Sequence, residues 1–410
     1  MSERPIDVAV VGAGAAGLMA AIQAGRTGPA RRIVALDGAA RLGAKILIAG
    51  GGRCNVTHDT VDEGAFAGSS RHAIRKVLRR FDVPETVAFF RALGVVLKRE
   101  ETGKLFPTTD RAATVLDALL GAAARAGVEL RHPWRVERIA PADGGFVVHG
   151  PAGELRARTV VLATGGRSVP KTGSDGHGLA MATALGHTVA RVFPALVPLT
   201  LPRDHFLTAL AGVSARVTVE VRSATGKRLA RFTDPLLCTH FGVSGPVVLD
   251  ASRWWIDARL ADPGARLVVS WLPDETRESI DAWLRDLGAA SPGRRLQSWL
   301  PERLARALCA AAGVDPSAPG RELSRDGRRA LVASLVEMPL PVTGDRGFTH
   351  AEVTAGGVPL AELRLETMAS RVVPGLHLCG EICDVDGRIG GYNFQWAWAS
   401  GWVAGTSVGR

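Results

Sequence analysis

The sequence is poor in cysteine, with five cysteines among 410 residues and no C-x-x-C pair. An odd number of cysteines argues against the fully paired disulfide framework that stabilises small secreted domains. The lack of closely spaced pairs also argues against a thioredoxin-like dithiol. We therefore expect reduced cysteines and a cytoplasmic protein.

Long hydrophobic runs are also missing. Residues 8–24 are apolar enough to imitate the core of a signal peptide, but Glu3 and Asp7 flank them and glycines recur at fixed offsets. No other segment approaches the roughly 18 uninterrupted apolar residues that a membrane helix requires. We interpret residues 8–24 as strand, turn and helix, and expect no membrane association.

Lysine is scarce, since only six of the 50 lysine and arginine residues are lysines. The formal net charge of +10 would favour anionic partners if the basic residues were clustered, but they are scattered along the chain. The densest cluster lies in residues 71–80, where a spacing of four places Arg71, Arg75 and Arg79 on one helical face. We interpret this face as solvated, which argues against a nucleic-acid partner and favours a small-molecule substrate.

The remaining composition indicates an α/β protein. Glycine is plentiful with 48 residues, tyrosine occurs once, and 46% of the residues are hydrophobic, as expected for many tight turns between strands and helices. A chain of 410 residues exceeds what one hydrophobic core usually holds, so two domains are expected. No repeat of fixed period and no low-complexity tract is present.

The strongest motif is G-A-G-A-A-G at residues 12–17, which follows an apolar β-branched run and opens a helix-like segment. In such motifs the first glycine, Gly12, permits the tight turn, Gly14 lets the backbone approach a pyrophosphate, and Gly17 allows close packing of helix on strand. Asp37 lies twenty residues beyond Gly17, at the end of the second predicted strand, where a carboxylate binds ribose hydroxyls. The sequence therefore predicts a Rossmann-type dinucleotide-binding domain.

This motif alone does not distinguish NAD from FAD, because both carry the same ADP moiety. The predicted strand 159–163 ends in Thr164-Gly165-Gly166, and a Gly380-Glu381 turn occurs late in the chain. Both features resemble the distal motifs of flavoproteins with two dinucleotide-binding folds. A second G-x-G-x-x-G is missing, so we expect NAD(P)H to dock only transiently as the reductant.

Several further motifs carry a resemblance to a known family. They are G-G-G-R-C-N-V-T at 50–57, A-T-G-G at 163–166 with P-K-T-G at 170–173, T-H-F-G-V-S-G-P at 239–246, and G-G-Y-N-F-Q at 390–395. In these motifs and their order the sequence resembles the BaiN-like family of bacterial flavoproteins, from Val8 to Gly405. The resemblance implies FAD as cofactor, and either reduction of conjugated C=C bonds in enone-like or bile-acid-like substrates or amine oxidation.

The predicted architecture is α/β with a discontinuous first domain. Residues 1–190 and 350–410 are expected to form a Rossmann-type FAD-binding domain with a parallel sheet, helices and a small β-meander. Residues 191–349 are expected to form an insert that is β-rich over 191–273 and helical over 274–340. The resemblance implies that the insert is barrel-like.

The candidate cofactor-binding residues come from glycine-rich turns, predicted strand ends and the start of the last helix. They are Gly12, Gly14, Ala15, Ala16, Gly17, Asp37, Arg41, Lys45, Gly52, Arg53, Asn55, Thr57, Val136, Ala163, Thr164, Gly165, Gly166, Gly380, Glu381, Gly391, Tyr392, Asn393 and Phe394. We predict that Arg53 pairs with the pyrophosphate and that a helix beginning after Gly391 stabilises negative charge on the reduced flavin. The alternatives are that Arg41 and Lys45 are merely solvated and that Gly390-Gly391 is only a turn.

Candidate catalytic groups are His240, Lys171 and Tyr392, each able to donate a proton. His240 is equally well explained as a histidine that stabilises its loop. Cys54 is interpreted as structural, although Arg53 adjoins it. No metal is expected, because His377, Cys379 and Cys383 have no fourth ligand at usable spacing.

We predict an FAD-dependent oxidoreductase in which NAD(P)H reduces the flavin and the flavin N5 passes hydride to an unsaturated, enone-like small molecule. One alternative is an amine oxidase that uses O₂ to reoxidise FAD. Another is a flavin-containing protein that binds or modifies RNA. The sequence does not specify the oligomeric state.

Overall fold

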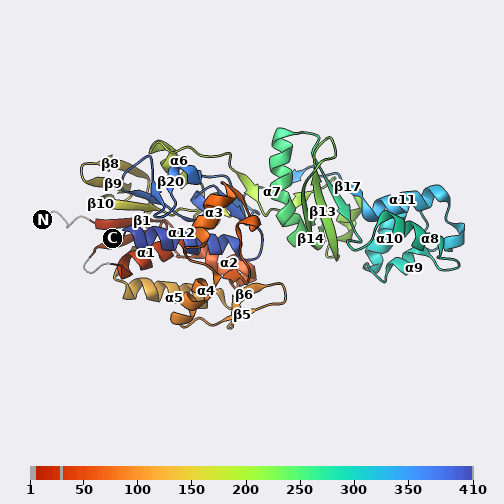
Figure 1. The fold of residues 1–410 in the computed structure, drawn as a ribbon, viewed down its shortest axis with the longest axis horizontal. Coiled ribbons are helices and arrows are strands. Elements are labelled where there is room, and N and C mark those ends of the chain that lie inside the picture. The colour runs from red at the N-terminus through yellow and green to blue at the C-terminus, as the bar shows by residue number, and fades with distance from the viewer. Residues whose placement is uncertain (1–5, 28–30, 409–410) are drawn as a thin grey trace. The chain divides into compact units, whose positions relative to one another are not determined.

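The computed structural model describes residues 6–27 and 31–408, which divide into two compact units (Figure 1). Unit 1 combines the residues up to Pro194 with those from Glu352 onward, and unit 2 is Ala195–Ala351. None of the described helices has the length and hydrophobicity needed to cross a membrane.

Unit 1 is built on a mixed sheet whose centre is parallel. In spatial order the parallel strands are β22 (Leu376–Leu378), β10 (Gly153–Leu162), β1 (Ile6–Val11), β2 (Ile33–Leu36) and β7 (Val128–Arg131). Antiparallel strands extend it, namely β20 (Leu363–Arg364) and β21 (Ala369–Ser370) at one edge and the β8 (Arg138–Ala142) and β9 (Gly145–Gly150) hairpin beside β10. The predicted Rossmann-type sheet with a small meander is confirmed.

The first and last helices of the described chain, α1 (Ala15–Arg26) and α12 (Tyr392–Val408), lie side by side (Figure 1). A Cβ on Gly401 would lie 2.5 Å from the Ala16 carbonyl oxygen, and one on Gly405 would lie 2.3 Å from that of Ala20. Glycine at these two positions, one helical turn apart, therefore lets the two backbones approach closely. This contact joins the two separate parts of unit 1.

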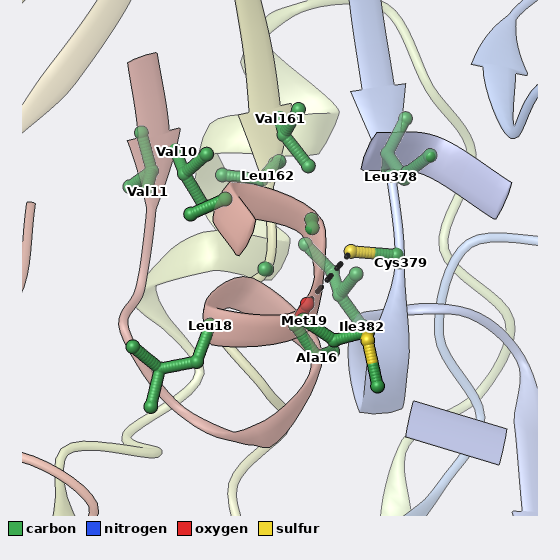
Figure 2. Packing of buried hydrophobic residues seen from close by; sticks show 14 of the residues in the cluster. Val10, Val11, Ala16, Leu18, Met19, Val161, Leu162, Leu378, Cys379 and Ile382 are labelled. Carbon is green, nitrogen blue, oxygen red and sulfur yellow. Dashed lines mark hydrogen bonds between the residues drawn. The ribbon is translucent and has the colours of Figure 1, made fainter. Parts of the chain in front are cut away.

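Apolar side chains from three parallel strands pack on α1, as Figure 2 shows. Those labelled are Val10 and Val11 of β1, Val161 and Leu162 of β10, and Leu378 of β22, with Ala16, Leu18 and Met19 of α1. Every residue of β2 is also buried. Continuous apolar strands of this kind are expected where helices cover both faces of a parallel sheet.

Among the described residues, five more helices and three small sheets complete unit 1. The helices are α2 (Ala44–Gly52), α3 (Arg71–Leu78), α5 (Ala112–Arg125) and α6 (His177–Ala184), with α4 (Val83–Ala92) described below. The short strands are β3 (Thr57–His58), β4 (Phe66–Gly68), β5 (Leu97–Arg99), β6 (Lys104–Pro107), β11 (Phe193–Ala195), β19 (Val353–Ala355) and β23 (Val385–Gly387).

Residues 73–93, which the spacing predicts as one helix, form two. A second helix, α4, begins after Asp82. The Asp82 carboxylate accepts a bond from the Glu85 amide at 3.1 Å, and the Glu85 carboxylate accepts one from the Asp82 amide at 3.3 Å. This reciprocal capping box starts a new helix at a point where the apolar spacing alone shows no break.

Unit 2 contains a seven-stranded antiparallel sheet. Its order is β17 (Met338–Leu340), β16 (Arg266–Ser270), β13 (Ser214–Arg222), β14 (Arg228–Thr239), β15 (Gly242–Ser244), β12 (Leu199–Thr200) and β18 (Gly344–Asp345). Within the described residues β17 and β18 each have a single neighbour, so the sheet is open and the barrel-like expectation was wrong. Helix α7 (Pro246–Ala261) packs on β13 and β14.

The later part of unit 2 is helical, as the sequence predicts. It contains α8 (Arg277–Arg285), α9 (Pro292–Leu296), α10 (Glu302–Ala311) and α11 (Arg325–Val336). Within unit 2 these helices form a cluster of their own beyond β17 (Figure 1).

Candidate functional site

Four parallel strands of unit 1 end in register. Val11 pairs with Leu36 on one side and Leu162 on the other, and Leu162 pairs with Leu378. Their carboxyl ends therefore form one edge, the place where open α/β sheets bind ligands. The residues that follow these strand ends are Gly12, Asp37, Ala163 and Cys379.

The glycines of residues 12–17 differ in their surroundings as the motif predicts. A Cβ on Gly12 would lie 2.5 Å from the Ala163 carbonyl oxygen, and one on Gly17 would lie 1.8 Å from the Gly12 carbonyl oxygen. A Cβ on Gly14 would meet no atom within 4 Å. Packing thus requires the first and third glycines, whereas Gly14 borders open space at the N-terminus of α1. Helix N-termini of this kind bind phosphates.

Asp37 is held in place by the turn that it faces. Its Oδ2 accepts a hydrogen bond from the Ala13 amide at 2.7 Å, and its Oδ1 accepts one from the Ala39 amide at 2.8 Å. A carboxylate offers about four lone-pair positions, so these two bonds leave capacity for a diol. The carboxylate is therefore fixed beside the open space above Gly14.

Two buried polar atoms in the predicted cofactor segments have no hydrogen-bond partner among the described residues. They are the side-chain oxygens Asn55 Oδ1 and Thr164 Oγ1. An unsatisfied buried polar group costs roughly 1–3 kcal/mol, so such atoms usually have a partner that the protein itself does not supply. Thr164 follows the end of β10 at this edge of the sheet, and both atoms fit hydrogen bonding to a polar ligand.

A cavity of about 530 Å³ lies in unit 1. It is lined by residues that follow β7 and β10 in the sequence. Its polar lining includes Arg135, Arg167, Asp175 and His177, and the Arg135 guanidinium is 2.7 Å from the Asp175 carboxylate. The Asp175 pKa is lowered: burial raises it, but the His177 amide and Arg135 more than compensate. The cavity therefore presents fixed positive and negative groups.

Three residues of this cavity, Arg135, Arg167 and Asp175, were not predicted from the sequence. Two of them could have been found from their places in the sequence. Arg135 directly precedes Val136, a predicted cofactor contact, and Asp175 and Gly176 directly precede a helix. Val136 itself is buried, with 5% of its surface exposed, and it lies in a loop before β8.

Lys45 and Glu381 form an ion pair that joins distant segments. Lys45 Nζ lies 2.9 Å from Glu381 Oε2 and donates to Ser168 Oγ at 2.7 Å. Glu381 Oε1 accepts bonds from Ser168 Oγ at 2.9 Å and from the Thr354 amide at 2.8 Å. Burial raises the pKa of Glu381, but Lys45 and these donors outweigh it and lower that pKa overall. Lys45 is thus not merely solvated.

The two arginines predicted near the cofactor behave differently from Lys45. Arg53 Nη1 lies 2.6 Å from Glu100 Oε1, and the guanidinium stacks 4.0 Å from the centre of the Phe106 ring. Arg53 therefore has partners within the protein other than the predicted pyrophosphate. Arg41 is exposed, which agrees with the alternative that it is solvated. Gly52 has a φ of +84°, a left-handed conformation that favours glycine.

The polar side chains of the G-G-Y-N-F-Q motif hold the start of α12. Asn393 Oδ1 accepts from the Gly387 amide at 2.8 Å, and its Nδ2 donates to the Gly387 carbonyl at 2.9 Å. Gln395 Oε1 accepts from Thr57 Oγ1 at 2.7 Å, and a Cβ on Gly391 would lie 2.6 Å from the Thr57 carbonyl carbon. These contacts fix a helix N-terminus, where the backbone amides of residues such as Phe394 lack intrahelical acceptors.

The structure separates the three candidate proton donors. Tyr392 stacks on His58 with ring centres 5.0 Å apart, and His58 was not predicted. Lys171 is exposed on a short 3₁₀ turn of unit 1. His240 is exposed between β14 and β15 in unit 2. Among the described residues, no hydrogen bond, ion pair or ring contact joins any two of these three candidates.

The five cysteines are buried, and burial raises the pKa of their thiols. Burial raises the pKa of the Cys54 thiol to about 12, and it raises that of Cys379 to about 12 as well. His377 Nδ1 lies 3.0 Å from the Thr367 carbonyl oxygen, which fits donation by an Nδ1–H group. Among the described residues no group of three or more His, Cys, Asp or Glu side chains forms a metal site.

Comparison with known proteins places these features in a wider context. Residues 6–407 match the HI0933-like protein Rossmann domain. The chain is 34% identical over 406 residues to a 3-dehydro-bile acid delta(4,6)-reductase of Clostridium scindens, covering 98% of each chain. It is also 34% identical over 403 residues to a ribosomal RNA dihydrouridine synthase of Escherichia coli, covering 97% of this chain and 96% of that one.

A solved structure shares the fold. The 3-ketosteroid delta1-dehydrogenase of Sterolibacterium denitrificans is 13% identical, with a TM-score of 0.53, and the match covers 98% of this chain and 99% of that one. At this identity the likeness concerns the fold alone.

Proposed function

The chain belongs to the HI0933-like protein family, and from that premise we propose that it reduces a carbon–carbon double bond conjugated to a carbonyl group, with FAD as its cofactor. The observation that carries the proposal is the chemistry shared by two relatives of equal identity. One name describes reduction of a 3-oxo steroid that has conjugated double bonds. The other describes reduction of the uracil ring, whose double bond is also conjugated to a carbonyl.

The residues at the carboxyl edge of the sheet fit FAD. We assign the pyrophosphate to the N-terminus of α1 beside Gly14 and a ribose diol to Asp37. The unpaired oxygens of Asn55 and Thr164 would bind further polar groups of the cofactor, and the first turn of α12 would face its electron-rich ring edge. When bound, FAD supplies hydride from the flavin N5 position.

The chain's own groups position the cofactor and supply a proton. The Lys45 and Glu381 pair links α2 to the segments that contain Ser168 and Thr354, so it holds the edge of the site together. Reduction of a conjugated bond also requires a proton at the carbon next to the carbonyl group. Tyr392, Lys171 and His240 remain the proposed donors.

We assign NAD(P)H as the reductant, docking transiently because the sequence contains a single G-x-G-x-x-G element. Mixing the FAD-loaded protein anaerobically with NADH or NADPH is expected to bleach the flavin absorbance. The faster of the two reactions identifies the preferred nucleotide. Retention of full absorbance with both nucleotides would reject NAD(P)H as the reductant.

A second candidate substrate is uracil within RNA. It is favoured by the relative named for RNA and by the net charge of +10, which suits a polyanion better than a singly charged bile acid even though the basic residues are scattered along the chain. The two candidates are separated by supplying the reduced enzyme with a 3-oxo-4,6-dienoic bile acid or with unmodified ribosomal RNA. Loss of dienone absorbance identifies the first substrate, and dihydrouridine found by mass spectrometry of RNA digests identifies the second. Turnover of neither would overturn the proposed function.

A further inference from the structure

We propose that one end of the unit 2 sheet binds the phosphate backbone of RNA. The surface consists of Arg222, Lys227, Arg228, Arg231 and Arg266, which are called the basic cluster below. The proposal deepens the second candidate substrate named above and rests on it, because it assigns the surface of the chain that contacts the RNA.

Strand pairing brings together basic residues that are separated in the sequence. Strand β13 lies between β14 and β16, and Arg222 at its end pairs in register with Arg228 on one side and Arg266 on the other. Earlier on β13, Glu220 lies opposite Arg231 of β14. Like charges opposite each other destabilise a sheet, so this row of arginines does not serve the stability of the strands. Such a row favours a negatively charged partner.

A single carboxylate is shared by three of these arginines. Glu220 Oε2 lies 2.8 Å from Arg222 Nη2. Glu220 Oε1 lies 3.5 Å from Arg228 Nη1 and 3.9 Å from Arg231 Nε. Arg222 has a second partner in Glu337, whose Oε1 lies 2.5 Å from Arg222 Nη1. Two carboxylates therefore serve three guanidinium groups, which leaves a surplus of positive charge.

The other two members of the basic cluster have no counter-ion. Lys227 and Arg266 form no ion pair among residues 195–351, all of which the structure describes. Arg266 extends over the turn between β13 and β14, since a Cβ on Gly226 would lie 3.9 Å from its Nη2. The Asp262 carboxylate accepts a hydrogen bond from the Ala224 amide of this turn at 2.7 Å. The positive charges of Lys227 and Arg266 therefore add to the surplus on the other three residues.

The guanidinium groups of the cluster are exposed and held from below by the sheet. The Arg228 and Arg231 side chains are 58% and 51% exposed, whereas the Glu220 side chain that they contact is 16% exposed. Val219 and Val221 alternate with Glu220 along β13 and are buried. Successive side chains of a strand point to opposite faces, so the cluster lies on the face opposite to these valines. The exposed arginines are therefore oriented by Glu220 before a ligand binds.

The spacing and chemistry of the row fit a strand of phosphates. Neighbouring strands lie about 4.8 Å apart, so Arg228, Arg222 and Arg266 cover about 10 Å. A nucleic-acid strand carries charges at a comparable spacing, with one phosphate per nucleotide. Guanidinium groups bind phosphate oxygens through two parallel hydrogen bonds. An anionic membrane fits less well, because membrane-binding surfaces also present several apolar side chains, and Leu229 is the one large apolar side chain exposed within the fully described residues 214–231.

Replacement of the two exposed arginines tests the basic cluster. Binding of a fluorescein-labelled ribosomal RNA fragment to the FAD-loaded protein is measured by fluorescence anisotropy between roughly 50 and 200 mM salt. Arg228→Ala/Arg231→Ala should weaken binding about tenfold and lower the slope of log K against log salt by about two, because each lost phosphate contact lowers that slope by about one. Arg228→Lys/Arg231→Lys should keep most of the slope, because counterion release depends on charge. The matched control Arg294→Ala/Arg295→Ala removes the same charge from α9 and should bind RNA within about twofold of the wild type.

A second pair of substitutions leaves the contacts of Glu220 intact. Lys227→Ala/Arg266→Ala removes the two side chains that have no ion pair, so it should weaken RNA binding while thermal unfolding and FAD content stay those of the wild type. RNA affinities of both pairs equal to that of the α9 control would overturn the proposal. Binding of the wild type to phosphatidylserine vesicles but not to RNA would also overturn it and would identify a membrane partner.

The readouts separate this proposal from the proposed function. If the cluster binds RNA but the RNA digest contains no dihydrouridine, RNA fails as the substrate and the binding surface stands. If dihydrouridine forms with wild-type efficiency in Arg228→Ala/Arg231→Ala, the substrate stands and the basic cluster is not its binding surface. Reduction of the dienone should be the same in every variant and in the wild type, because a small substrate does not need the cluster.

Discussion

At the scale of single residues, glycine in the first turn serves two separable purposes. Gly17 is needed by the fold, since a Cβ there would lie 1.8 Å from the Gly12 carbonyl oxygen. Gly14 is not needed for packing, since its φ is −79° and a Cβ there would meet nothing within 4 Å, and we assign it to the ligand. Packing and binding at these two positions can therefore be tested independently.

The first prediction contrasts Gly14→Ala with Gly17→Ala. Gly17→Ala should destabilise the apoprotein by about 1–3 kcal/mol, the usual cost of overpacking, in chemical denaturation. Gly14→Ala should unfold like the wild type but bind FAD at least about tenfold more weakly, because its methyl group occupies the approach of the pyrophosphate. Wild-type FAD affinity in Gly14→Ala, measured by fluorescence titration, would contradict the assignment of the pyrophosphate.

The second prediction concerns Thr164, whose buried hydroxyl has no partner among the described residues. Thr164→Val removes that hydroxyl at similar volume, so the apoprotein should become more stable by about 1 kcal/mol. The same change should weaken FAD binding about fivefold, because one hydrogen bond contributes on the order of 1 kcal/mol. We therefore expect Thr164→Val to raise the stability of the apoprotein and to lower its affinity for FAD. Equal FAD affinity in Thr164→Val and in the wild type would rule out a cofactor contact.

The sequence could predict those residues whose role depends on local spacing. Asp37 and the glycines of residues 12–17 follow from short-range pattern, and the structure places them at one sheet edge. The sequence predicted a pyrophosphate contact for Arg53. Its partner in the structure, Glu100, lies 47 residues away, so no local pattern could reveal that ion pair. Arg135 and Asp175 were missed for the same reason, because their pairing spans 40 residues and follows only from the folded topology.

At the scale of secondary-structure elements, the Lys45 and Glu381 pair links four segments that are far apart in sequence. The pair joins α2, the loop after β10, β19 and the 3₁₀ turn Gly380–Ile382. The sequence predicted both residues near the cofactor but not their contact with each other. The contribution of this ion pair to the site can therefore be tested in the protein without a ligand.

The third prediction is a pH dependence. Because the pKa of Glu381 is lowered on folding, its contribution to stability is complete above the unfolded-state pKa, near the ordinary glutamate value of 4.5. That contribution is lost as the pH falls through the lower folded-state pKa. Glu381→Gln should destabilise the protein by about 2 kcal/mol at neutral pH, measured by denaturant unfolding. The difference in unfolding free energy between Glu381→Gln and the wild type should shrink below about pH 4.5. A difference independent of pH would contradict an ionised Glu381 carboxylate.

Two mistakes at this scale have physical causes. Residues 73–93 keep apolar spacing across the Asp82 cap, so periodicity alone suggests one helix instead of α3 and α4. The insert was expected to be barrel-like, but closure depends on which edge strands pair. The edge strand β18 and its neighbour β12 have two residues each, too short for a sequence pattern to reveal.

At the scale of the whole molecule, the question is which substrate class the charge favours. The net charge of +10 is spread over both units, and many arginines are already paired with carboxylates. A neutral or singly charged steroid gains little binding affinity from such a charge. RNA gains affinity, because its binding to a positively charged protein releases counterions.

The fourth prediction uses salt to separate the two substrates. If RNA is the substrate, kcat/KM on ribosomal RNA should fall by at least about tenfold between roughly 50 and 200 mM salt. With the bile-acid dienone as substrate, kcat/KM should change less than about twofold over the same range. A flat salt response with RNA would show that the positive charge has no part in its recognition.

We propose that FAD bound to this chain passes electrons to a bond conjugated with a carbonyl group. It is tested most directly by reducing the FAD-loaded protein photochemically without oxygen and adding either the dienone or the RNA. We expect the oxidised flavin spectrum to return in step with one equivalent of product whose double bond is saturated. A protein that takes up no FAD, or a flavin that stays reduced with both compounds, would contradict it.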